Sequence, residues 1–302
     1  AIDLYGTMPY RSVAKEIGVP KSTLWDFYSA NGFTKKGVGK GTAKILFLDL
    51  EIAPSLCVAF QRFKVNMTQD NVIQEPYILT YAGAWYGGEV FSDKLTNYKA
   101  LWDIDITNDF MLTKAIRDLL DSADIVIAHN AKFDTGQFNN RCMYWGLEKP
   151  SPYKVICTLR ELRKHFCLPS NSLKSATAYL ELTRKLDSGG MLTWKRAIQG
   201  DATALDEMEQ YNIGDIPTLM ELYDKIRPYM TSHPNVNVVN NDSTLSCYKC
   251  GSSDIVELEG KYSYTNAGKY KLHICSNCGS HVSSKENLLS KEKRASLSRS
   301  TI

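Results

Sequence analysis

The sequence contains no run of about 18 apolar residues, the length that a membrane-spanning helix would need. Its apolar stretches, such as the one around Ile125–Ala128, have only the length of a strand. The first residues, AIDLYGTMPYRSVAKEIG, lack the charged and then apolar pattern of a secretory signal, so we expect a cytoplasmic protein with no membrane partner. The excess of basic over acidic residues is also small, 36 against 33, which argues against a polycation that coats nucleic acid.

The composition that remains is that of a globular protein with about two domains. Of its 302 residues, 43% are hydrophobic and 11% are aromatic, so the chain can bury a core and is too rich in aromatics for a disordered one. Shifts in composition divide it into a helix-turn-helix at 8–30, a Lys- and Gly-rich linker at 31–43, an α/β domain at 44–230, an Asn-rich linker at 231–245, a cysteine segment at 246–282 and a basic tail at 283–302.

Hydrophobic periodicity in the α/β domain predicts paired strands first and helices later. Strand patterns occupy Ile45–Leu50, Leu56–Phe63, Ile78–Trp85, Glu89–Phe91 and Ile125–His129. Helical patterns occupy Phe110–Leu120, Asp134–Tyr144, Leu159–Phe166, Leu173–Leu182, Ala204–Tyr211 and Pro217–Ile226. This order favours an α/β fold in which helices flank a mixed sheet.

The amino-terminal segment has the spacing of a helix-turn-helix. Ala14 permits a close approach of two helices, Gly18 permits a tight turn, and Leu24 closes the small core. The second helix would then present Lys21, Ser22 and Thr23 to DNA. The alternative is a helical hairpin that serves packing or protein contact.

Acidic residues occur at the ends of two predicted strands and on a later helix. Asp49 and Glu51 close the first strand, and their spacing of two residues places both carboxylates on one face. Two like charges there are unfavourable unless a cation neutralises them. Asp134 follows the strand Ile125–His129 at a helix start, where the alternative role is an N-cap. Tyr211 and Asp215 are four residues apart and share one face of a helix.

Together, Asp-x-Glu, then Asn-x-x-Phe-Asp (from Asn130), then Tyr-x-x-x-Asp resemble the three exonuclease motifs of the DEDD (DnaQ-like) family, tyrosine subclass. The resemblance covers about 44–229 and extends to predicted exonucleases of phages and bacteria. It implies a ribonuclease-H-like fold. It also implies that Asp49, Glu51, Asp134 and Asp215 bind metal and that Tyr211 positions the attacking water.

This resemblance implies a specific chemistry. Carboxylate oxygens suit Mg²⁺ or Mn²⁺, and two such ions about 3.5–4 Å apart can activate a water and stabilise a leaving 3′-oxygen. The expected reaction is 3′–5′ hydrolysis of a DNA strand with release of nucleoside 5′-monophosphates. Asn130 and Phe133 are candidate substrate-binding residues, although Phe133 also fits a core position. Pro217 predicts a helix break near Gly214, and His129 is interpreted as structural.

Four of the cysteines form two C-x-x-C-G sequences near the end of the chain: Cys247, Cys250, Cys275 and Cys278. The residues between them include strand patterns at Ile255–Leu258 and Tyr270–Ile274, as in a zinc ribbon. We predict one structural Zn²⁺ bound by the four thiolates, because so short a segment cannot bury enough apolar surface to fold alone. Lys249 and other lysines of this segment are candidates for phosphate contact.

Two further functions remain open at this point. One is a DNA-binding protein whose helix-turn-helix and zinc ribbon grip DNA while the nuclease fold is inactive. The other is a nuclease of the same fold that acts on RNA or on DNA junctions. The full set of four acids favours the 3′–5′ exonuclease.

Overall fold

A computed structural model describes residues 43–61, 63–182, 190–239 and 244–298. The predicted helix-turn-helix, with Lys21, Ser22 and Thr23, lies outside the described residues, as does nearly all of the linker at 31–43. Among the described helices, none combines the length and the apolar character that crossing a membrane requires.

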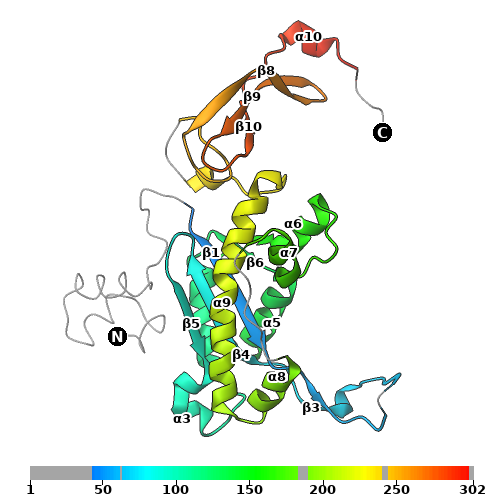
Figure 1. Cartoon of the computed structure of the whole chain (residues 1–302), viewed down its shortest axis with the longest axis vertical. Coiled ribbons are helices and arrows are strands. Elements are labelled where there is room, and N and C mark those ends of the chain that lie inside the picture. Colours follow the sequence, from blue (N-terminus) through cyan, green and yellow to red (C-terminus); the bar gives the residue numbers. More distant parts are fainter. Residues whose placement is uncertain (1–42, 62, 183–189, 240–243, 299–302) are drawn as a thin grey trace, which may run out of the picture. The chain divides into compact units, whose positions relative to one another are not determined.

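A mixed sheet of five strands in the order β5-β4-β1-β6-β7 forms the centre of the α/β domain (Figure 1). Its strands are β1 (Ile45–Ile52), β4 (Ile78–Trp85), β5 (Val90–Lys94), β6 (Ile125–Ala128) and β7 (Lys154–Cys157). β1 is central, antiparallel to β4 and parallel to β6. The fold class predicted from the sequence is therefore confirmed.

Alternation along β1 separates the core into two layers. Leu46, Leu48 and Leu50 pack on one face with side chains of α4 (Phe110–Ser122) and α5 (Ala131–Tyr144). Ile45 and Phe47 pack on the other face with α9 (Ala202–Ile226). Because side chains alternate, Asp49 and Glu51 continue the row that faces α9.

Helix α9 runs through 25 residues without interruption, so the predicted break at Gly214 is wrong. Pro217 removes one helical hydrogen bond at a cost of about 3 kcal/mol. Ile216 and Leu219 on either side of it are almost fully buried, and each contributes roughly 2 kcal/mol. Packing therefore outweighs the proline and keeps Tyr211 and Asp215 on one continuous helix.

The remaining helices surround this sheet. They are η2 (Leu95–Tyr98), α3 (Lys99–Trp102), α6 (Thr158–His165), α7 (Leu173–Tyr179), α8 (Met191–Ile198) and η3 (Arg227–Tyr229). The sequence patterns for α4, α5, α6 and α7 are confirmed, whereas α3, α8 and the short strand β7 were not predicted.

A buried ion pair joins α4, α5 and β4. Asp109, fully buried at the start of α4, accepts hydrogen bonds from Arg141 Nε at 2.8 Å and Nη2 at 2.7 Å. It also accepts from Trp145 Nε1 and from the Ile78 backbone N–H. Because one carboxylate receives four donors, it fixes α5, and therefore Asp134, against the sheet.

The predicted strand Leu56–Phe63 is mostly wrong. Only β2 (Leu56–Cys57) forms there, and it pairs with β3 (Val72–Gln74) after a loop that contains η1 (Gln69–Asn71). None of the described residues from 54 to 76 is buried. The apolar residues of this segment therefore have no core to pack against. Alternation of apolar and polar residues predicts a strand only where one face of the strand is buried, and here neither face is.

The cysteine segment folds as a three-stranded sheet in the order β10-β9-β8. Its strands are β8 (Ile255–Thr265), β9 (Gly268–Cys275) and β10 (His281–Ser283). In the chain, η4 (Val236–Val239) precedes this sheet and α10 (Lys291–Ala295) follows it. Both predicted strand patterns in this segment are confirmed.

Lys249 is 3% exposed, and its Nζ donates to the carbonyl oxygens of Arg227 at 3.1 Å and Pro228 at 2.8 Å. These carbonyls follow the end of α9, where a cation is favourable. The interpretation of Lys249 as a phosphate contact is therefore wrong, because its ammonium group caps a helix end instead of facing solvent.

Candidate functional site

Three carboxylates from two elements meet beside the central strand. Asp49 and Glu51 extend from β1, and Asp215 extends from α9, which packs on the same face. Their ligand oxygens all lie within 4.8 Å of one another. Glu51 and Asp215 are buried and Asp49 is half-buried, so three negative charges converge where water screens them poorly.

Asn212 holds the carboxylate of Asp49 in place. Its side chain is fully buried, and its Nδ2 donates to Asp49 Oδ2 at 2.6 Å and to the Asp49 carbonyl oxygen at 3.3 Å. Thr80 Oγ1 on β4 donates to Asn212 Oδ1 at 3.2 Å. The amide therefore links β4, α9 and the first carboxylate. No role was predicted for this residue, although it lies between Tyr211 and Asp215, because its importance depends on hydrogen-bond partners that the sequence does not display.

Asp134 lies next to this group but is not part of it. Its Oδ1 accepts the backbone N–H of Leu50, the residue between Asp49 and Glu51, at 3.4 Å. The parallel pairing of β1 with β6 covers Ile45–Phe47, so Leu50 lies beyond it and its N–H can meet the start of α5. Burial raises the pKa of Asp134 to about 7, against the opposing effect of backbone hydrogen bonds.

The turn between β6 and α5 positions Asp134. Asn130 adopts a left-handed conformation with φ 69° and is the N-cap residue, so Asp134 is not the N-cap that the sequence left as its alternative role. His129 contacts Thr158 Oγ1 at 2.9 Å and the carbonyl oxygen of Asn171 at 3.0 Å, which confirms its structural role. Phe133 is 47% exposed, so its alternative as a core residue is wrong.

Tyr211 is half-buried and lies one helical turn before Asp215 on α9. The continuous helix keeps the two residues on the same face, with Cβ atoms about 5–6 Å apart by helical geometry. The shared helix face predicted for Tyr211 and Asp215 is therefore confirmed.

The three carboxylates fit a hard divalent cation. Mg²⁺ binds oxygen at about 2.0–2.1 Å, so opposite ligands of an octahedral ion lie about 4.2 Å apart. The separation of the carboxylate oxygens is compatible with this arrangement. A cation also neutralises the converging negative charges, which otherwise oppose folding.

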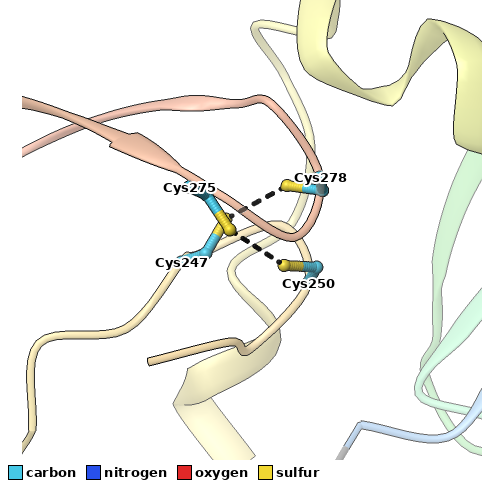
Figure 2. Close-up of side chains that lie close together, drawn as sticks. All are labelled: Cys247, Cys250, Cys275 and Cys278. Atoms are coloured by element: carbon cyan, nitrogen blue, oxygen red, sulfur yellow. Dashed lines mark hydrogen bonds between the residues drawn. The ribbon is translucent and has the colours of Figure 1, made fainter. Parts of the chain in front are cut away.

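The four cysteines of the carboxyl-terminal segment form a second candidate metal site (Figure 2). Their Sγ atoms all lie within 4.8 Å of one another, and the pairs Cys247–Cys278 and Cys250–Cys275 are each 3.6 Å apart. Thiolates about 2.3 Å from a tetrahedral Zn²⁺ lie about 3.8 Å apart, whereas a disulfide would need about 2.05 Å. The cluster therefore fits a four-thiolate zinc site and not a pair of disulfides.

Burial keeps one thiol of this cluster protonated. It raises the pKa of the Cys247 thiol to about 12, so in the absence of metal this thiol stays protonated at neutral pH. Zinc binding must displace that proton, which makes zinc affinity increase with pH.

Comparison with known proteins identifies part of the chain. Residues 89–227 match the family model described as RNase_H superfamily, and this segment extends from β5 to the end of α9. It contains Asp134, Tyr211 and Asp215, while β1 with Asp49 and Glu51 precedes it. This part of the chain is an RNase H superfamily domain. No curated protein matches the chain.

One solved structure to which the chain shows similarity is the family B DNA polymerase from the hyperthermophilic archaeon Pyrobaculum calidifontis. The similarity has a TM-score of 0.46 at 12% sequence identity and covers 63% of this chain and 25% of the polymerase chain. The chain thus spans about a quarter of the length of that polymerase.

Proposed function

We propose that residues 44–230 form a metal-dependent 3′–5′ exonuclease of the DEDD type, tyrosine subclass, that acts on single-stranded DNA ends and releases nucleoside 5′-monophosphates. The observation that carries this proposal is the convergence of Asp49, Glu51 and Asp215 from two elements of an RNase H-like domain. Buried like charges are costly to keep together, so a protein that only binds DNA gains nothing from them.

In this proposal the acidic residues hold two Mg²⁺ or Mn²⁺ ions. Such ions, when bound, activate water and stabilise the charge of the leaving oxygen. Asp49, Glu51 and Asp215 provide the shared ligand set. We assign Asp134, beside Leu50, as the fourth ligand; burial raises its pKa to about 7 in the metal-free chain, so a cation that binds below that pH must displace its proton.

Other side chains orient the substrate. Tyr211, one turn before Asp215, donates a hydrogen bond to the attacking water and holds it in line with the scissile phosphate. Phe133 is exposed beside Asp134 and stacks on the terminal base, while Asn130 at the head of α5 contacts the last nucleotide. These roles predict a preference for unpaired ends, because a paired base cannot reach the aromatic ring.

The test follows the shortening of 5′-labelled DNA and RNA strands of about 20 nucleotides, with free or blocked 3′ ends, in Mg²⁺. We expect stepwise shortening of the free DNA end, and a loss of at least about a thousandfold in Asp49→Asn and Asp215→Asn. Glu89→Gln, at an exposed turn, provides a matched control with unchanged activity. Activity that survives in Asp49→Asn would refute the proposal, and faster cleavage of RNA would reassign the substrate.

We also propose that Cys247, Cys250, Cys275 and Cys278 bind one structural Zn²⁺ in a zinc ribbon. The tetrahedral set leaves no open coordination position, so the site supports folding and not hydrolysis. We expect one zinc per chain by elemental analysis, less than a tenth of that in Cys275→Ser, and a full complement in Cys167→Ser, whose cysteine is exposed elsewhere. Equal zinc content in the two variants would refute this site.

A further inference from the structure

The hairpin formed by β2, the following loop and β3 (residues 56–74, here the β2–β3 hairpin) exposes large apolar side chains. Phe60 is fully exposed and Phe63 is 84% exposed, and Ile73 on β3 is 64% exposed. An aromatic side chain in water forgoes the free energy that its burial would provide. Two such rings at the end of one hairpin therefore indicate a surface that a ligand covers.

The base of this hairpin is ordered and joined to the candidate active site. Ala53 N donates to the Tyr77 carbonyl oxygen at 2.8 Å, so a hydrogen bond joins the two ends of the segment that carries the hairpin. Trp194 Nε1 donates to the Ile52 carbonyl oxygen at 3.2 Å. Ile52 directly follows Glu51, one of the three carboxylates, so the hairpin leaves the sheet at the site (Figure 1).

Hydrogen bonds within the hairpin also join its two sides. Val58 N donates to the Asn71 carbonyl oxygen at 2.8 Å, and Asn71 Nδ2 donates back to the Val58 carbonyl oxygen at 3.3 Å. Thr68 N donates to Asn71 Oδ1 at 3.0 Å. These contacts hold the two sides together without using the rings of Phe60 and Phe63, which stay accessible.

The charge of this segment distinguishes a nucleic acid from a protein partner. Between Glu51 and Asp70 the sequence contains Arg62 and Lys64 and no acidic residue. Lysine and arginine attract phosphates, and aromatic rings stack on bases of any sequence. Aromatic rings that alternate with cations are therefore the combination expected for a single strand.

From these observations we propose that the β2–β3 hairpin is a stacking platform on which Phe60 and Phe63 bind unpaired bases of the strand whose 3′ end lies at the carboxylates. This inference rests on the proposed function, because it takes the same strand as ligand. Phe60 lies nine positions after Glu51 in the chain, so the platform lies at most roughly 30 Å from the carboxylates. A stacked strand rises about 3.4 Å per nucleotide, so strands longer than about nine nucleotides reach it at any distance within this limit.

The test measures the binding of fluorescent single-stranded DNA to the full chain by anisotropy, without added divalent cation so that no strand is cleaved. For a strand of about 20 nucleotides, we expect Phe60→Ala and Phe63→Ala each to weaken binding at least about fivefold. Phe60→Trp retains the affinity, because it retains the stacking face, whereas Phe60→Leu does not. Ile104→Ala, at an exposed apolar residue before α4, is the matched control and binds as the wild type does.

The length of the DNA strand distinguishes a failure of this inference from a failure of the proposed function. With a substrate of about four nucleotides in Mg²⁺, the hairpin variants keep the wild-type rate, because so short a strand occupies only the carboxylate site. The platform is refuted if the double variant Phe60→Ala/Phe63→Ala binds the long strand with an affinity within twofold of wild type. It is also refuted if that variant loses self-association while its DNA affinity stays unchanged. Hairpin-dependent binding without any hydrolysis retains the platform and refutes the nuclease.

Discussion

Replacing Asn212 with Leu tests whether one buried amide controls the acidic site. Leu has the same branched arrangement of side-chain heavy atoms, but it cannot donate to Asp49 Oδ2, which is 2.6 Å from Asn212 Nδ2. A hydrogen bond to a charged group contributes about 1.5–3 kcal/mol. If that energy orients Asp49 during hydrolysis, kcat/KM decreases by roughly 10- to 150-fold, because each 1.36 kcal/mol is a factor of ten in rate.

The assay for Asn212→Leu combines three measurements: kcat/KM on single-stranded DNA, Mn²⁺ affinity by electron paramagnetic resonance, and the free energy of unfolding in urea. We expect weaker Mn²⁺ binding together with lower kcat/KM in a protein that still folds. Thr80→Val, which removes only the hydrogen bond to Asn212 Oδ1, gives the same changes at a smaller size. Gln210→Leu on the exposed side of α9 is the control. Unchanged Mn²⁺ affinity and kcat/KM in Asn212→Leu would refute the positioning role.

Three further predictions concern buried charges. Because burial raises the pKa of Asp134 to about 7, ionisation of this group opposes folding above that pH. Asp134→Asn is therefore more stable than the metal-free wild type at about pH 8, and the difference disappears below about pH 4. If the variant and the wild type unfold at the same urea concentration at both pH values, this prediction is wrong. Burial lowers the pKa of His233 to about 4, so the unfolded chain takes up a proton first as pH falls. The stability contributed by neutral His233 is lost between about pH 6.5 and 4, and His233→Gln flattens this part of the stability curve; an unchanged slope would exclude it. Arg141→Ala leaves Asp109 buried without its cation and destabilises the protein by about 3–5 kcal/mol in urea melts, while a loss below about 1 kcal/mol would show that water reaches the carboxylate.

The sequence predicted the layered α/β fold because its main elements are strongly patterned. β1 and β4 are apolar runs that the core buries almost completely, so they were recognised without knowledge of their neighbours. Strand periodicity predicted that Asp49 and Glu51 share a face, and helix periodicity predicted the same of Tyr211 and Asp215. The meeting of Asp215 with the two strand acids was implied by the resemblance to the DEDD family. The role of each acid remains a prediction.

Other features depend on contacts that a sequence does not display. The continuity of α9 through Pro217 depends on packing on both sides of the ring, which outweighs local propensity. The partner of Asp134 is a backbone N–H, and any residue except proline in place of Leu50 would offer the same donor. Asn212 was missed because a buried asparagine on a helix becomes informative only when its two hydrogen-bond partners are known.

The cap that Lys249 places on the carbonyls of Arg227 and Pro228 has a mechanical consequence. If zinc loss unfolds the cysteine segment, α9 loses this cap and begins to fray from its carboxyl-terminal end. Asp215 lies eleven residues before Ile226, the last residue of the helix, which is about three turns away from the fraying end. The buried side chains of those turns insulate the acidic site, so fraying at one end of the helix leaves the arrangement of Asp49, Glu51 and Asp215 in place.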